Sequence, residues 1–249
     1  MSGHSQFKNI MYRKGAQDAK RAKIFTKVIR EITVAVKASG ADKESNPQLR
    51  TALISAREAN MPKDTVERAI KKALGNDDTT TYQEMRYEGY GPAGSALIIE
   101  SLTDNRNRTS AEVRSYFNKF GGSIGETNSV SYKFDHLGYL VFSKEGLSME
   151  AVFEVALEAG ADDVLETEDG FEVFCALEGL GIVRDFCATK LGEPQAARPL
   201  WRPKVLVPVS TEAGRTLLKL IDALEDNDDV QTVTTDANFP QELLCDLDG

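Results

Sequence analysis

The sequence predicts an α+β protein of three domains: an N-terminal helical domain and two ferredoxin-like α/β domains, one inserted in the other. Three observations carry this prediction. Apolar residues recur at helical spacing over the first third of the chain, and short strand-like and helix-like segments alternate over the rest. The charge also changes sign near residue 75. We therefore expect domains at residues 1–80, at 81–134 joined with 204–249, and at 135–203.

Three helices are expected in the first domain. The first begins at Gln17, and its apolar residues recur on one face. Asn46 before Pro47 is a favourable start for the second helix, because asparagine caps helices and proline suits the first turn. The third begins at Pro62 or Asp64 and ends at Gly75. The residues expected to face inward are Phe25, Val28, Ile29, Ile32 and Val36, then Leu49, Ala52, Leu53 and Ala56, then Val66, Ala69, Ile70, Ala73 and Leu74.

Strands and helices alternate after residue 81. Strands are expected at 95–102 and 130–134, around a helix that the capping-box spacing Thr109 to Glu112 opens. A complete βαββαβ set follows, the order of a ferredoxin-like domain. Its strands are expected at 139–142, 163–168, 171–177 and within 197–201, and its helices at 149–159 and 180–190. A strand at 205–209, a helix at 211–224 and a strand at 231–235 complete the outer domain as a second βαβ–βαβ set.

Positive charge is concentrated towards the N-terminus. Residues 1–75 carry sixteen basic and seven acidic side chains, a formal +9, in a chain whose net charge is −9, so residues 76–249 carry −18. A basic segment on an acidic body is typical of a protein whose basic part meets a polyanion. The sign changes at the polar residues 75–81, which we interpret as a linker.

Two groups of basic residues are candidate nucleic-acid contacts. The first lies in the N-terminal segment and along the helix face opposite the apolar one. The second lies at a predicted helix start, where backbone N–H groups and forked guanidinium groups favour phosphate. The candidates are Lys8, Arg13, Lys14, Lys20, Arg21, Lys23, Lys27 and Arg30, together with Arg106 and Arg108. Two other interpretations stay open: a solvated amphipathic helix, and arginines paired with Asp104 or Glu112.

The sequence offers no outline of a catalytic or metal site. Its three cysteines are far apart, and its two histidines include His136, which we place in a loop. No nucleophile stands beside a base, so we expect no enzyme, metal or cofactor. The glycine-rich residues 87–94 are not followed by the Gly-Lys-Ser/Thr sequence that completes the phosphate-binding loop of NTPases. We interpret them as a turn between strands, with the tyrosines packed against the protein. The cluster Asp222, Glu225, Asp226, Asp228 and Asp229 is interpreted as a solvated or protein-binding surface.

The sequence also leads to expectations about the cellular location and the oligomeric state of the protein. No apolar run reaches the about 18 residues of a membrane helix, so no membrane contact is expected. The N-terminal segment is not a secretory signal, because it has no apolar core. We expect a cytoplasmic protein, and a monomer.

Several motifs resemble those of the YebC/PmpR family. They are the run at residues 3–27, Asn-Met-Pro-Lys-Asp at 60–64 with Glu-Arg-Ala-Ile-Lys at 67–71, Arg-Tyr-Glu-Gly-Tyr-Gly-Pro at 86–92, Leu-Thr-Asp-Asn-Arg-Asn-Arg-Thr at 102–109, and Leu-Ile-Asp-Ala-Leu-Glu-Asp at 220–226. The resemblance implies three domains, no catalysis and a role as a probable transcriptional regulator; some relatives are regarded as translational activators that act with the ribosome. The chain departs from the family pattern at Gln6 and Phe7, where relatives often have lysine and tryptophan, near Met11, and after Val233.

We therefore expect a non-enzymatic, nucleic-acid-binding regulator of gene expression, in the first place a DNA-binding transcriptional regulator. One alternative is a ribosome-associated translation factor that binds rRNA through the N-terminal domain, because aromatic residues among the cations suit unstacked RNA bases. A second alternative is a protein-interaction scaffold. The acidic domains offer a surface for a protein partner in each case.

Overall fold

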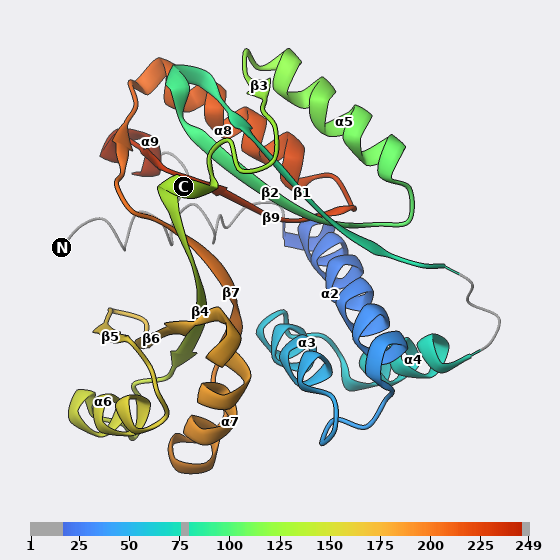
Figure 1. The fold of residues 1–249 in the computed structure, drawn as a ribbon, viewed down its shortest axis with the longest axis vertical. Coiled ribbons are helices and arrows are strands. Elements are labelled where there is room, and N and C mark those ends of the chain that lie inside the picture. Colours follow the sequence, from blue (N-terminus) through green and yellow to red (C-terminus); the bar gives the residue numbers. More distant parts are fainter. Residues whose placement is uncertain (1–16, 76–79, 246–249) are drawn as a thin grey trace. The chain divides into compact units, whose positions relative to one another are not determined.

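The computed structural model describes residues 17–75 and 80–245 of the chain (Figure 1). These residues form two compact units. Unit 1 contains the residues up to Arg30, those from Thr80 to Asp135 and those from Pro203 onward, and unit 2 contains 31–75 and 136–202. Helix α2 (Gln17–Ser39) contributes to both units. Helices and antiparallel sheets together confirm the predicted α+β class. The division into three domains stays a prediction.

The helices expected near the N-terminus are present, with α3 at Pro47–Glu58 and α4 at Lys63–Leu74. Asn46 is the cap: its side chain accepts a hydrogen bond from the Leu49 N–H at 2.9 Å and donates to the carbonyls of Ala35 and Gly40. Two residues that were predicted to face inward differ from the prediction. Leu53 is only half-buried, and its neighbour Ile54, which was not predicted to face inward, is buried in the core of unit 2. Leu74 is 58% exposed, because it is the last residue of α4, beyond the buried Ala73.

Unit 1 is built on a four-stranded sheet of order β3-β1-β2-β9. Its strands are β1 (Gln83–Tyr90), β2 (Ala96–Thr103), β3 (Ser123–Ile124) and β9 (Val230–Thr235), and each neighbouring pair is antiparallel. Helices α5 (Arg106–Lys119) and α8 (Thr211–Glu225) cover one face of this sheet (Figure 1). Phe117 and Leu217 from these helices pack with Leu97 and Ile99 of β2 in one core.

The chain order in unit 1 differs from the predicted βαβ–βαβ set. Strand β1 was missed, because three of its first four residues are polar: Gln83, Glu84 and Arg86. Residues 131–133 form a 3₁₀ turn, η2 (Ser131–Lys133), in place of most of the expected strand. The reason is the buried Glu88, whose carboxylate accepts hydrogen bonds from the Val130 and Ser131 N–H groups at 2.9 Å. Burial alone would raise the pKa of Glu88, but these bonds outweigh it and lower the pKa.

Two shorter predictions in unit 1 also needed correction. The expected strand at 205–209 is reduced to β8 (Val207–Pro208), which pairs in parallel with β10 (Ala237–Asn238). Helix α5 begins at Arg106 rather than Thr109, because Asn105 provides the cap by accepting a hydrogen bond from the Arg108 N–H. The last described element is α9 (Gln241–Cys245), and η1 (Pro92–Gly94) follows β1.

The glycine-rich segment is a turn between strands only in its second half, at η1, because residues 87–90 belong to strand β1. A Cβ atom on Gly89 would lie 2.5 Å from the Ser123 carbonyl oxygen, so glycine is what allows β3 to pair with β1. Tyr87 is buried in the core, and the Tyr90 hydroxyl donates to the Ser129 carbonyl at 3.2 Å.

The sheet of unit 2 has the order β5-β6-β4-β7, the arrangement of a ferredoxin-like domain. The elements are β4 (Phe134–Phe142), α6 (Met149–Glu158), β5 (Asp163–Glu166), β6 (Phe171–Ala176), η3 (Leu177–Gly179), α7 (Leu180–Leu191) and β7 (Ala196–Pro203). Val152 of α6 and Val183 of α7 pack against Leu140 and Val173 of the sheet. His136 lies in β4 rather than in a loop, stacked on Trp201 at 3.9 Å.

Candidate nucleic-acid interface

The predicted contacts divide into those outside the described structure and those within it. Lys8, Arg13 and Lys14 lie outside the described residues. The backbone at Lys20 belongs to α2, but its side chain is outside the description. Arg21 is exposed, with its guanidinium carbon 5.4 Å from the centre of the Phe25 ring. The remaining α2 candidates have partners within unit 1.

Lys23 and Lys27 meet the C-terminal end of α8. The Lys23 ammonium lies 2.7 Å from a carboxylate oxygen of Asp226, and the Lys27 ammonium donates to the Glu225 carbonyl at 3.0 Å. A helix C-terminus attracts cations because its last carbonyl groups point outward without helical partners. Burial lowers the pKa of Lys27, and the charge of Glu225 partly counteracts this effect. Lys27 is therefore a structural contact between α2 and α8.

Arg30 and Arg108 converge on a single carboxylate, that of Asp229. Each guanidinium lies 2.6 Å from an Asp229 oxygen, Arg30 on one oxygen and Arg108 on the other. The Asp229 side chain is only 4% exposed. Thr109 also donates to it at 2.6 Å and Thr103 at 3.2 Å. This carboxylate thus connects α2, α5 and the end of β2 with the turn before β9.

Hydrogen bonding decides the charge state of Asp229. Burial would raise its pKa, but hydrogen bonds from Arg108, Thr109 and Arg30 favour the ionised form more strongly and lower the pKa to about 2. Buried charges are tolerated when they are paired and hydrogen-bonded in this way. Asp229 had appeared to be one member of a solvated acidic cluster, and this interpretation was wrong for it. Asp222 and Asp228 are exposed as expected.

Arg108 follows the alternative interpretation offered by the sequence, since it also pairs with Asp104 at 2.8 Å. Its neighbour Arg106 behaves differently. Arg106 is exposed, and it forms no hydrogen bond or ion pair with any residue in the described part of the chain. Sequence reasoning could not separate these two arginines, because their roles depend on which one faces Asp229.

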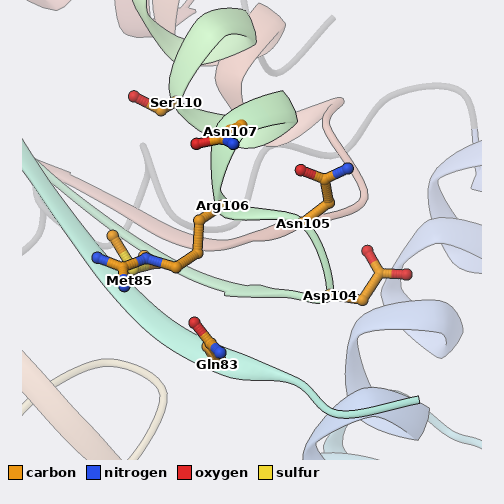
Figure 2. Close-up of a pocket in the computed structure, with 7 residues that line it drawn as sticks. All are labelled: Gln83, Met85, Asp104, Asn105, Arg106, Asn107 and Ser110. Carbon is orange, nitrogen blue, oxygen red and sulfur yellow. The ribbon is translucent and has the colours of Figure 1, made fainter. Parts of the chain in front are cut away.

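Arg106 lines a polar hollow at the N-terminal end of α5 (Figure 2). The hollow has a volume of about 490 Å³ and is lined by Gln83, Met85, Asp104, Asn105, Arg106, Asn107 and Ser110. Its donors are amide, hydroxyl and guanidinium groups, which suit a phosphate or a base edge. Asp104 contributes the single carboxylate to this lining and opposes an anion there.

Among the described residues, no three His, Cys, Asp or Glu side chains are grouped closely enough to hold a metal ion. Within 17–75 and 80–245, no helix combines the length and the apolar composition needed to cross a membrane.

Comparison with known proteins agrees with this architecture. Residues 5–76 match the family model of the TACO1/YebC protein N-terminal domain, and residues 82–237 match that of the TACO1/YebC second and third domains. The crystal structure of a conserved hypothetical protein from Aquifex aeolicus is similar, with a TM-score of 0.80 and 40% sequence identity over 94% of this chain and 97% of that chain. The chain therefore belongs to the TACO1/YebC family, a family of transcription and translation regulators rather than of enzymes.

Proposed function

We propose that this protein regulates gene expression by binding the phosphate backbone of nucleic acid through its N-terminal basic region, in the first place as a DNA-binding transcriptional regulator. The observation that carries the proposal is the charge partition, +9 over residues 1–75 against −18 over the rest. Acidic domains repel a polyanion and so restrict its contact to the basic end of the chain.

The hydrogen bonds and ion pairs that some candidate cations form within the protein reduce the number of candidates for phosphate contact. Lys23, Lys27, Arg30 and Arg108 already hold carboxylate or carbonyl groups, so a phosphate would have to displace a partner. We therefore assign phosphate contact first to Arg106, which is exposed, and to the candidates that the sequence places in the basic N-terminal segment: Lys8, Arg13, Lys14, Lys20 and Arg21. The basic residues of the sequence 1–75 also include Lys71 and Lys72, which are exposed on α4.

Charge reversal at the basic end tests the proposal. The double variant Lys20→Glu/Arg21→Glu should weaken binding to a duplex DNA probe at least about tenfold, since charged contacts dominate backbone affinity. The matched control is Arg114→Glu/Lys219→Glu, which makes the same change in net charge at exposed positions of α5 and α8. An equal loss in both variants would mean that only net charge matters, and the proposed interface would be wrong.

A second candidate function is translation regulation through rRNA. Phe7 and Tyr12 stand among the cations of the N-terminal segment, and aromatic rings can stack on the unpaired bases of irregular RNA. Co-sedimentation with ribosomes, compared with a gel shift on duplex DNA, separates the two targets. Binding to ribosomes alone, lost in Lys20→Glu/Arg21→Glu, would replace the transcriptional proposal with the translational one. Binding to neither would favour the interaction scaffold.

A further inference from the structure

The outward face of α6 in unit 2 combines exposed apolar and acidic side chains. Phe153 and Leu157 are 47% and 61% exposed, although both are large and apolar. They lie four residues apart, and Glu150 and Glu154 are exposed at the same helical spacing. The four residues form one stripe along the helix, which we call the α6 stripe.

The packing of the domain does not account for the α6 stripe. The opposite side of α6 is already used, because Val152 and Ala156 are buried in the core against Leu140 and the other sheet residues. A helix that is apolar on both faces is normally covered on both. Neighbouring exposed apolar groups mark interaction surfaces in soluble proteins. Phe153 and Leu157 therefore indicate a surface that a partner covers.

The charge of α6 indicates what kind of partner this is. The helix carries three glutamates and no lysine or arginine. Glu158 is paired with Lys190 at 2.7 Å, whereas Glu150 and Glu154 form no ion pair with any other described residue. The stripe repels nucleic acid and attracts cations. A basic surface with its own apolar side chains would both bury Phe153 and Leu157 and pair with the two glutamates.

We propose that the α6 stripe is a docking site for a basic amphipathic helix of another protein. That helix would present aliphatic side chains one turn apart, flanked by lysine or arginine. Because α6 has ten residues, the contact is short, below the roughly 1,000 Å² of a stable complex, and reversible. This site is independent of the proposed nucleic-acid interface and would recruit protein while the basic end binds nucleic acid.

A labelled peptide tests the proposal with the full-length protein. The probe is a fluorescein-labelled helical peptide of leucine and lysine, about four turns long, and the readout is fluorescence anisotropy. Phe153→Ser/Leu157→Ser should raise Kd at least about tenfold, a loss of 1.4 kcal/mol or more. Glu150→Gln/Glu154→Gln should raise Kd about threefold and reduce its dependence on salt. The control Ile182→Ser/Val205→Ser removes two side chains that are each 71% exposed and should leave Kd unchanged.

Three outcomes would overturn the proposal. One is equal binding of the peptide to wild type and Phe153→Ser/Leu157→Ser, since the attraction would then be general to an acidic protein. Another is the absence of any binding by wild type. The third is self-association in sedimentation that the Phe153→Ser/Leu157→Ser variant abolishes, because a second copy of the chain would then cover the stripe. DNA and ribosome binding should be unchanged in the α6 variants. A failure of the docking proposal can therefore be distinguished from a failure of the proposed function.

Discussion

At the scale of single residues, Asp229 is the side chain on which unit 1 depends most. It accepts hydrogen bonds from two arginines and two threonines, and these donors come from α2, β2 and α5. Removing one partner of a buried pair leaves an uncompensated charge, which costs more than the pair contributes when intact. The loss of this carboxylate would leave the largely buried Arg30 in that condition, whereas Arg108 would keep its ion pair with Asp104.

Asp229→Ala should therefore lower the free energy of unfolding by about 3–5 kcal/mol. Urea denaturation, followed by circular dichroism, measures the change. Asp228→Ala is the matched control, because the neighbouring carboxylate is exposed, and its effect should stay within about 0.5 kcal/mol. Similar effects in the two variants would contradict the central role of Asp229.

The pH dependence of stability provides a second test of Asp229. Its pKa in the folded protein is about 2, below the value of about 3.9 expected in the unfolded chain. A carboxyl group with a lowered pKa stabilises the fold above its unfolded pKa, and this contribution is lost as the pH falls through the folded pKa. The difference in unfolding free energy between wild type and Asp229→Asn should be largest above about pH 4 and shrink towards about pH 2. A difference that stays constant over this range would exclude the assignment.

At the scale of elements, α2 shows what periodicity can and cannot predict. Its apolar face was predicted correctly, since Val28, Ile32 and Val36 are all buried. Its basic face was predicted to be a surface for phosphate, but part of it lies against the end of α8. The helical periodicity of the sequence shows that these cations share one face of α2. It does not show that another helix presents carbonyl groups to that face.

Charge reversal along α2 should therefore have two different effects. Lys27→Glu places a carboxylate beside the Glu225 carbonyl and near Asp226 and Asp228, and should destabilise the protein by about 2 kcal/mol. Arg21→Glu removes an exposed cation over a ring and should cost less than about 1 kcal/mol. Thermal unfolding of the two variants measures this contrast. If both variants unfold at the same temperature, Lys27 is not the structural contact described above.

At the scale of the whole molecule, ion pairs within the units neutralise part of the positive end. In unit 2, Arg50 pairs with Asp185 at 2.8 Å and Arg57 with Glu193 at 2.8 Å. The Arg184 guanidinium donates to the Pro47 carbonyl and the Thr51 hydroxyl. The formal +9 of residues 1–75 is therefore an upper limit on the charge that a polyanion meets, and the number of phosphate contacts should be small.

Salt dependence measures that number for the full chain. With about five phosphates neutralised, the logarithm of the association constant should fall against the logarithm of salt concentration with a slope of about −4.5 on duplex DNA, and about −3.5 on a single strand. Arg106→Ala should reduce the slope by about one unit if this side chain holds a phosphate. A slope near zero would exclude backbone binding and favour the scaffold.

The sequence by itself determined the fold class, most of the helices, the ferredoxin-like order of the elements between residues 134 and 203, and the separation of charge along the chain. These properties follow from local periodicity, capping residues and composition. Only the tertiary structure decided which cations are occupied, that Glu88 turns the chain at residues 130–131, and that Asp229 is buried rather than solvated. The physical reason is that each of these depends on groups more than forty residues apart in the chain, and their charges and hydrogen bonds meet only once the fold has formed.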